Sequence, residues 1–157
     1  MNDYLFTFTD QIRQALKEDL GDAGDITSQA IIASDRIAEA TLVSRQAGRI
    51  CGLQTALSAF QILDPGVTID IRVVDGADVG AGETLATLRG NARALLAAER
   101  TALNLLAHMC GIATVTNHAV VQIKEYSADV VCTRKTTPGL RALEKYAVRV
   151  GGGKNHR

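Results

Sequence analysis

Two adjacent cations, Arg134 and Lys135, are the residues whose types and position most clearly predict chemistry in this chain. They follow an apolar run over 128–132 that has the length and composition of a buried parallel strand. Two hydroxyl side chains, Thr136 and Thr137, come directly after them. Proteins of the α/β class bind anions at the carboxyl ends of such strands, where arginine forms a planar fork and lysine supplies a point charge. The segment therefore predicts an anion-binding site, and the plainer alternative is two solvated surface charges.

A second cationic pair, His156 and Arg157, comes at the end of the sequence. The three glycines at 151–153 before it have two interpretations. They form either a flexible tail or a loop whose backbone must approach a ligand closely. In the second case His156 and Arg157 are further candidates for binding the anion.

Arg100 belongs to a polar ridge on a predicted helix. The spacing of the ridge is helical, and its other members are Arg93, Ala97, Asn104 and His108. The ridge contains no acid. It is either a solvated polar face or a surface that meets a partner subunit or a negatively charged ligand, and spacing alone does not decide between them.

The composition limits the class of protein. The 157 residues include 17 Lys and Arg against 17 Asp and Glu, so bulk charge does not predict binding to nucleic acid or to a membrane surface. Cations nevertheless gather after residue 132, where Glu144 is the single acid. No run approaches the ~18 consecutive apolar residues of a membrane span, and the N-terminus lacks the layout of a signal peptide. These features predict a soluble, cytoplasmic protein.

The three cysteines, Cys51, Cys110 and Cys132, are far apart and form no CxxC motif. A metal or redox motif is therefore not expected. Their apolar or glycine-flanked positions favour buried free thiols in a reducing cytosol.

Residues up to about 88 mix helical and strand patterns without regular alternation, which favours an α+β sandwich. The first helix is expected over 8–20, with Thr9 or Asp10 as its cap and Gly21 at its end. The other elements expected in this part are a short helix over 27–32, strands over 38–45, 68–75 and 84–88, and a helix over 53–63.

After residue 90 the pattern becomes that of a parallel βα architecture. The elements expected are a helix from the capping residue Asn91 to about Met109 with a break at Gly111, a second helix over 113–124, the strand over 128–132, and a helix with Pro138 in its first turn. We therefore expect a sandwich domain over 1–110 and the first units of an α/β barrel over 111–157. A (β/α)8 barrel needs about 200 residues or more, so the barrel is expected to be truncated.

The glycine-rich segment over 75–88 superficially resembles a phosphate-binding loop. It precedes no helix, carries three acids and lacks the GxGxxG and GxxxxGK(S/T) spacings, so turn glycines joining two strands are the favoured interpretation. The segment also resembles the strands of lipoyl and biotinyl carrier domains. It has no lysine that could be modified, which argues against a carrier.

Several long motifs, in one order along the whole chain, resemble the quinolinate phosphoribosyltransferase family. The segments that carry the resemblance are Glu18–Thr27, Glu99–Asn104, Gly111–Thr114, Thr133–Arg141, Glu144–Gly153 and Asn155–Arg157. The resemblance implies an N-terminal α/β sandwich domain joined to an α/β barrel. It also implies a homodimer in which the sandwich of one subunit covers the barrel mouth of the other.

The reaction of that family implies a role for each cation. It is a pentosyl transfer that joins quinolinate to phosphoribosyl pyrophosphate and gives nicotinate mononucleotide, pyrophosphate and carbon dioxide in NAD biosynthesis. By resemblance, Arg134, His156 and Arg157 would bind the quinolinate carboxylates. Lys135 would be the catalytic lysine, where quinolinate meets the sugar, and Arg100 would reach into the site of the neighbouring subunit. Magnesium would accompany the pyrophosphate, with ligands that lie beyond residue 157.

The family continues past the segment Asn155–Arg157 with a further lysine, acidic residues that contact ribose and metal, and a phosphate-binding loop. None of these follows here, so the chain alone is expected to be an inactive fragment. Two alternatives stay open. One is a non-catalytic dimerisation or carrier-like module, and the other is the molybdenum-transport-associated phosphoribosyltransferase-like group, which the segment Thr136–Arg141 resembles less closely.

Overall fold

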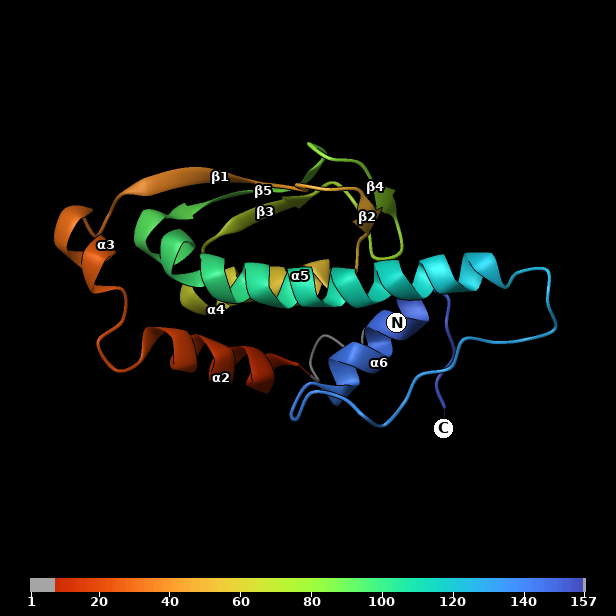
Figure 1. The fold of residues 1–157 in the computed structure, drawn as a ribbon. Helices are drawn as coiled ribbons and strands as arrows, with labels where there is room; N and C mark the ends of the chain where they lie inside the picture. The colour runs from red at the N-terminus through yellow and green to blue at the C-terminus, as the bar shows by residue number, and fades with distance from the viewer. Residues whose placement is uncertain (1–7, 157) are drawn as a thin grey trace.

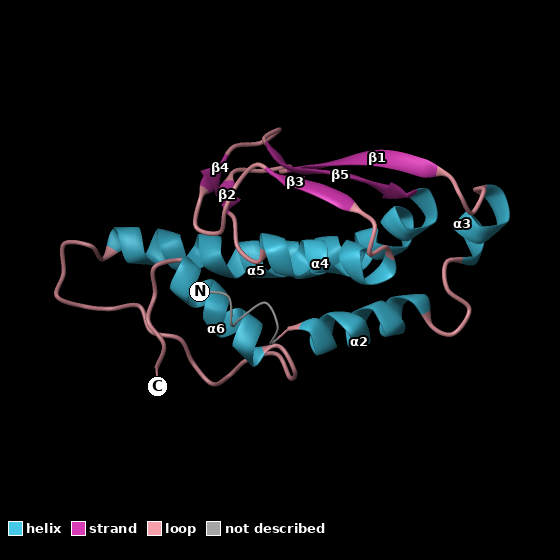
Figure 2. Ribbon diagram, turned by 180° about the vertical axis from the view of Figure 1, so that it is seen from behind, coloured by secondary structure: helices cyan, strands magenta, loops and turns pink. Residues whose placement is uncertain are grey.

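The structure is a computed structural model that describes residues 8–156. An antiparallel sheet forms one layer, and helices α4 (Leu53–Leu63) and α5 (Ala92–Gln122) lie against one of its faces. Helices α2 (Thr9–Leu20) and α6 (Arg141–Val150) lie on the far side of α4 and α5 (Figures 1 and 2). Met109 of α5 is fully buried in the apolar core between these layers. The arrangement confirms the predicted mixed α/β fold class.

The main sheet follows the predicted strands. In order across the sheet the strands are β1 (Ile37–Val43), β5 (Thr84–Asn91) and β3 (Thr68–Ile71). In the central strand Leu88 is buried, whereas the next residue, Arg89, is exposed and pairs with Glu39 at 2.9 Å. This alternation has the period of two that is typical of a strand, and it continues to Asn91, beyond residue 88 where the strand was predicted to end. Strand β3 is shorter than expected: it ends at Ile71, whereas the prediction extended to residue 75.

A second, two-stranded sheet was not predicted. It consists of β2 (Gly48–Arg49) and β4 (Asp78–Val79), which pair antiparallel. Elements of two residues have no periodicity that a sequence could reveal. β4 lies within the glycine-rich segment, which therefore forms turns between strands, as predicted.

The boundaries of α4 agree with the predicted helix over 53–63, and the glycine-rich segment supplies its cap. The carboxylate of Asp75 accepts hydrogen bonds from the amides of Gly52 at 2.7 Å and Leu53 at 3.0 Å. Gly52, at the N-cap position, has a φ of +78°, which is available to glycine without strain. An acid at the start of a helix also interacts favourably with the helix dipole.

The first helix, α2, is confirmed, but neither Thr9 nor Asp10 caps it. The N-cap position is occupied by Phe8, which makes no side-chain capping hydrogen bond and is buried in the core. Packing of this aromatic ring, rather than a polar cap, therefore fixes the start of the helix. Gly21 ends it with a φ of +57°, as expected from the sequence.

The short helix α3 (Ile26–Ile31) begins one residue earlier than predicted because Asp25 caps it. The Asp25 carboxylate accepts hydrogen bonds from the hydroxyl of Ser28 and, at 3.0 Å, from its amide. These two hydrogen bonds lower the pKa of Asp25 below its ordinary value.

The prediction of two helices separated at Gly111 was wrong, because α5 is continuous through this residue. Asn91 caps the helix as predicted and accepts from the amide of Arg93 at 3.0 Å. Glycine in a helix interior costs about 1 kcal/mol relative to alanine. The buried side chains of Met109 and Ala113, on either side of the glycine, stabilise the continuous helix by more than this cost.

The prediction of a buried strand over 128–132 was also wrong. Val131 is 50% exposed and forms a single parallel bridge with Lys154. The amide of Cys132 donates to the Lys154 carbonyl at 2.9 Å, and the amide of Lys154 donates to the Val130 carbonyl at 2.8 Å. The parallel alignment is therefore present, but over one residue pair only.

The last helix, α6, starts after the predicted position. It begins at Arg141, so Pro138 lies in the preceding turn and not in the first helical turn. In that turn the Leu140 amide donates to the Thr137 carbonyl at 3.0 Å. Gly139 has a φ of +81°, a conformation that other residues rarely adopt.

The glycines at 151–153 form a turn packed against α5 and are not a flexible tail. Gly151 and Gly153 are buried. A Cβ atom on Gly151 would lie 2.6 Å from the carbonyl oxygen of Ala113 and 2.6 Å from Cβ of Thr116. The close approach that requires glycine here is therefore an approach to a helix of the same chain.

Two glycine-to-alanine substitutions on α5 and its neighbouring turn should have opposite effects on stability. Gly151→Ala should lower the free energy of unfolding by about 2–3 kcal/mol, because the added methyl group meets the α5 backbone. Gly111→Ala should raise it by up to about 1 kcal/mol, because nothing lies within 4 Å of the new methyl group and alanine favours the helix. Urea unfolding followed by circular dichroism measures both. A Gly151→Ala protein as stable as the wild type would contradict the close packing of the turn.

Candidate functional site

The predicted cations Arg134 and Lys135 lie in the loop between the parallel bridge and α6, and both are exposed. None of the ion pairs within residues 8–156 involves either side chain. Within the loop, the Lys135 amide donates to the Thr133 hydroxyl at 3.1 Å. Within the described part of the chain, both charges are therefore directed to solvent and can meet an external anion.

Side chains from α6 stabilise this loop. Glu144 accepts a hydrogen bond from the Thr137 amide at 3.2 Å, and its other oxygen lies 3.0 Å from Nε2 of His108 on α5. Partial burial would raise the pKa of Glu144, but the hydrogen bonds from Thr137 and His108 lower it below its ordinary value. Arg141 donates to the hydroxyl of Thr136 at 3.1 Å. The single acid after residue 132 is thus bound to Thr137 and His108 and leaves the exposed cations unneutralised.

The parallel bridge brings His156 to the same loop. The side chain of His156 is exposed, and its amide donates to Sγ of Cys132 at 3.1 Å. Nζ of Lys145, from α6, donates to the same sulfur at 3.0 Å. Arg157 lies outside the described residues. The structure therefore places three of the predicted site residues, Arg134, Lys135 and His156, on segments joined through Cys132.

The three cysteines have different environments. Cys51 is buried as predicted, whereas Cys110 and Cys132 are only partly buried, so the prediction of three buried thiols was wrong for two of them. Burial raises the pKa of Cys51 and of Cys110, and the carboxylate of Asp75 raises both further. Partial burial also opposes ionisation of Cys132, but the hydrogen bonds from Lys145 and from the His156 amide lower its pKa below the ordinary value.

Arg100 lies on another part of the surface. Its side chain is 72% exposed, and Nη1 lies 2.8 Å from Oδ1 of Asp19. It lines an open pocket of about 470 Å³ whose walls include Asp25 and Asn104. No hydrogen bond or ion pair among residues 8–156 joins Arg100 to the loop that carries the other cations. The structure thus does not bring Arg100 together with the rest of the predicted site.

The polar ridge that includes Arg100 is occupied by contacts within the chain. Arg93 donates to the carbonyl of Ile32 at 2.8 Å and to that of Gln29 at 3.0 Å, which fixes the end of α3. Arg100 pairs with α2, and His108 pairs with α6. The ridge therefore connects α5 to three neighbouring helices, a role that its spacing did not distinguish from a solvated face.

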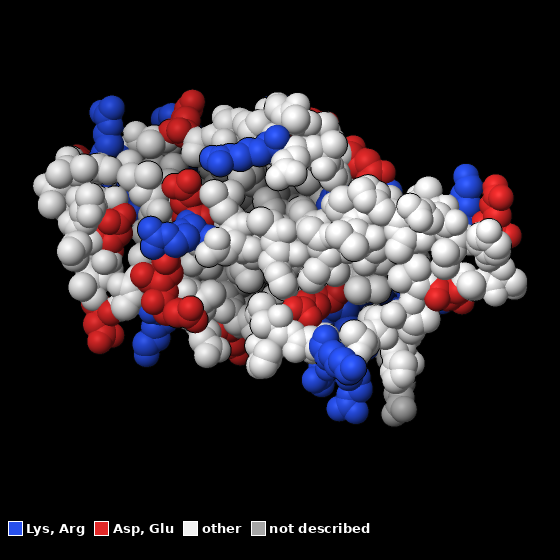
Figure 3. All heavy atoms as spheres, in the orientation of Figure 1, with Lys and Arg blue, Asp and Glu red and all other residues white. Residues whose placement is uncertain are grey.

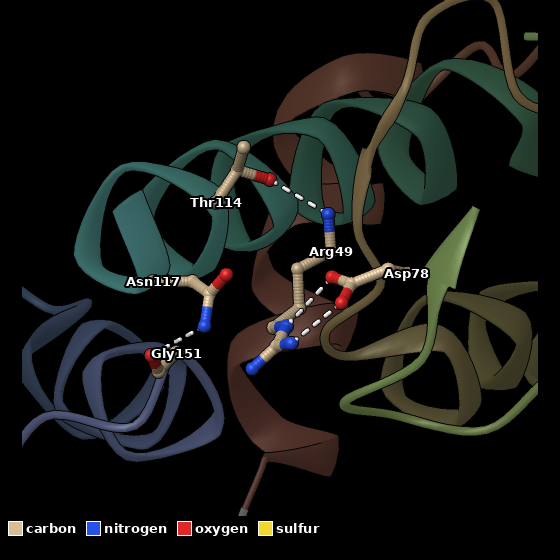
Figure 4. A network of polar contacts seen from close by, with 5 residues as sticks. All are labelled: Arg49, Asp78, Thr114, Asn117 and Gly151. Carbon is tan, nitrogen blue, oxygen red and sulfur yellow. Dashed lines mark hydrogen bonds and ion pairs between the residues drawn. The ribbon is translucent and has the colours of Figure 1, made fainter. Parts of the chain in front are cut away.

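A second group of polar contacts joins the small sheet to the C-terminal half of α5 (Figure 4). The guanidinium of Arg49 contacts Asp78 through two hydrogen bonds, of 2.8 and 2.6 Å, and the Arg49 amide donates to the Thr114 hydroxyl at 2.8 Å. Asn117 lies beside them and donates to the carbonyl of Gly151 at 3.5 Å. The Arg49 contacts thus join the small sheet to α5, and the Asn117 contact joins α5 to the turn that precedes His156.

Charges of both signs are interspersed over the face shown in Figure 3, in agreement with the balanced composition. One group of cationic side chains projects from the lower edge of that face. Between residues 8 and 156, no helix has the length and apolar character that crossing a bilayer requires.

Sequence reasoning identified the exposed cations but missed the residues that support them. Cys132 and Lys145 are 13 positions apart, and His108 and Glu144 are 36 apart. No helical or strand period connects such positions. The one local signal was a cysteine, Cys132, two residues before the cationic pair, and its apolar surroundings favoured a buried thiol instead.

The fold belongs to the α/β class, and its loop presents exposed cations and hydroxyl side chains after a parallel-paired segment, the kind of position where such proteins bind anions. Comparison with protein families identifies it further. The family model described as quinolinate phosphoribosyl transferase, N-terminal domain, matches residues 25–110, and the corresponding C-terminal domain model matches residues 112–157. The chain therefore belongs to the quinolinate phosphoribosyltransferase family. Because α5 runs through the junction of the two matches, a division into domains over 1–110 and 111–157 stays a prediction.

Individual relatives agree with this assignment. The chain is 48% identical over 153 residues to nicotinate-nucleotide pyrophosphorylase [carboxylating] of Mycobacterium leprae, with 94% of this chain and 53% of the relative covered. It is 45% identical to a probable nicotinate-nucleotide pyrophosphorylase [carboxylating] of Bacillus subtilis, with 89% and 48% covered. The crystal structure of NadC from Streptococcus pyogenes superposes with a TM-score of 0.93 at 39% identity, covering 97% of this chain and 54% of that one. The chain thus spans about half the length of the curated relatives it matches.

Proposed function

We propose that this chain supplies part of a site where a phosphoribosyl group is transferred from phosphoribosyl pyrophosphate to quinolinate. One observation supports this most directly. This chain belongs to the quinolinate phosphoribosyltransferase family, and its exposed pair Arg134 and Lys135 lies on a loop that is joined to His156 through the sulfur of Cys132. Such a set of donors suits a small ligand with two carboxylates.

The proposed reaction explains the need for positive charge. The pyridine nitrogen of quinolinate forms a bond to the anomeric carbon of the sugar while the bond from that carbon to pyrophosphate breaks. The carboxylate next to the nitrogen then leaves as carbon dioxide, and a proton takes its place. Both reactants are anions, so cations in a partly desolvated site offset their repulsion and orient the nitrogen toward the sugar.

The roles of the side chains are assigned by resemblance to the family. Arg134 and His156, with Arg157, would bind the two carboxylates of quinolinate. Lys135 would lie where quinolinate meets the sugar and would stabilise the charge that develops on the departing pyrophosphate.

Arg100 is proposed to act in the site of a second subunit within a homodimer. Two observations support this assignment. No hydrogen bond or ion pair among residues 8–156 joins Arg100 to the cationic loop, and the Arg100 side chain is 72% exposed. The pairing with Asp19 would orient the guanidinium outward without neutralising its capacity to bind a second partner, because a guanidinium has five N–H donors.

Two further parts of the proposal concern the surroundings of the site. Magnesium would enter together with phosphoribosyl pyrophosphate and neutralise charge on the pyrophosphate. Residues 8–156 contain no group of three or more His, Cys, Asp or Glu side chains that could hold a metal ion, so no step is assigned to the metal on this chain. The protein would act in the cytoplasm, where its three free cysteines stay reduced.

Calorimetric titration with quinolinate tests the proposal. We expect quinolinate to bind, and nicotinate, which has one carboxylate instead of two, to bind about tenfold more weakly or worse. The quinolinate affinity should fall as salt is raised, because the cations are exposed. Absence of quinolinate binding, or equal affinity for the two ligands, would overturn the proposed function.

A further inference from the structure

Cys132 has no part in the roles proposed above, yet its sulfur connects three segments of the chain. It lies at the start of the loop that carries Arg134, and it accepts hydrogen bonds from Nζ of Lys145 on α6 at 3.0 Å and from the amide of His156 at 3.1 Å. The backbone amide of Cys132 also donates to the Lys154 carbonyl at 2.9 Å. Side chain and backbone of one residue thus join the loop, the helix and the segment after the glycine turn.

The two segments that meet at this sulfur carry the groups expected to contact one ligand. Arg134 follows Cys132 by two residues, so its Cα lies within about 7 Å of the cysteine along the chain. His156 is bound to the sulfur through its own amide. The separation of the Arg134 and His156 side chains therefore depends on where the sulfur is fixed.

Lys145 fixes the sulfur relative to the body of the protein. Its helix, α6, packs on α5, and two neighbours of Lys145 contact other elements: Glu144 contacts His108, and Tyr146 donates to Asp75 at 2.7 Å. An ammonium is a strong donor to a polarisable sulfur, and the lowered pKa of Cys132 agrees with a sulfur that accepts two hydrogen bonds.

We propose that Cys132 is a positioning residue for the quinolinate site. Bound by Lys145 and by the His156 amide, its sulfur sets the spacing at which Arg134 and His156 meet the two carboxylates of one ligand. The inference rests on the proposed function, and it adds a residue that touches no substrate but controls the geometry of those that do.

Three variants of the full chain and one control variant test this inference, with quinolinate affinity measured by calorimetry. Cys132→Ala removes the acceptor and should weaken quinolinate binding about tenfold, as expected for the loss of oriented hydrogen bonds. Cys132→Ser restores a small acceptor and should return the affinity to within about threefold of the wild type. Lys145→Met should weaken binding about tenfold, whereas the matched control Lys124→Met, at an exposed site beyond the end of α5, should not change it.

A second measurement reports the Lys145 contact without any ligand. Iodoacetamide should modify Cys132 faster in the native protein than in urea at the same pH, because its native pKa is lowered. Lys145→Met should reduce that rate severalfold, and Cys51 and Cys110 should stay protected.

The outcomes separate the two proposals. If the wild-type chain binds quinolinate but Cys132→Ala binds it equally well, the positioning role is overturned and the proposed function stands. Equal loss of affinity in the serine and alanine variants, accompanied by a lowered thermal midpoint in both, would also overturn it, since packing alone would then explain the effect. If the wild-type chain does not bind quinolinate, the proposed function fails, and the positioning role fails with it.

Discussion

Replacing Arg134 with alanine should reduce the affinity for quinolinate about 30-fold or more. A guanidinium that makes two charge-assisted hydrogen bonds to a carboxylate contributes about 2–4 kcal/mol, and no other cation of the loop can replace its planar geometry. Arg134 is exposed and makes no ion pair within the described residues, so its loss should leave the fold intact. Calorimetric titration of both proteins under the same low-salt conditions measures the difference.

Two control variants show whether geometry or charge causes the loss. Arg134→Lys keeps the positive charge but removes the fork, and should recover only a small part of the affinity. Arg89→Ala removes an exposed arginine of the sheet, paired with Glu39, and should leave quinolinate binding unchanged. Wild-type affinity in Arg134→Ala would exclude this residue from the site.

The helices and strands with local periodicity could be predicted from the sequence, and the others could not. The boundaries of α4 agree with the prediction because its apolar residues recur every three or four positions and Asp64-Pro65 ends the pattern. The continuity of α5 could not be predicted, because the local preference of Gly111 is outweighed by contacts with elements distant in sequence. For the strand expected around Val131, the local sequence favoured an element that the rest of the structure does not complete. Its residues have the apolar composition of a strand, but they form one bridge only.

The residues of the candidate site also include some that could be predicted from the sequence and others that could not. Arg134 and Lys135 are adjacent in sequence, so their shared position was visible without a structure. The contacts of Cys132 with Lys145 and of Glu144 with His108 arise from the packing of α6 on α5, which no short segment encodes. The role proposed for Arg100 would require a second subunit, and a single sequence contains no direct record of such a contact.

The candidate site therefore depends on the position of α6, to which Asp75 contributes through Tyr146. The carboxylate accepts hydrogen bonds from the amides of Gly52 and Leu53 at the start of α4, and from the hydroxyl of Tyr146 on α6 at 2.7 Å. Burial and the hydrogen bond to this carboxylate both raise the pKa of Tyr146, in agreement with a phenol that donates to Asp75. One residue of the glycine-rich segment thus joins α4 of the sandwich to the helix that supports the cationic loop.

Replacing Asp75 with alanine should accordingly lower the free energy of unfolding by about 3–4 kcal/mol. The substitution removes a helix cap, together with the carboxylate that accepts from two amides and from the Tyr146 hydroxyl in a partly buried site. Tyr146→Phe removes one of the three hydrogen bonds and should cost about 1 kcal/mol, whereas Tyr126→Phe, at a side chain 72% exposed, should cost nothing measurable. Urea unfolding measures all three variants. If Asp75→Ala proved no less stable than Tyr146→Phe, the capping of α4 by this carboxylate would contribute nothing to stability.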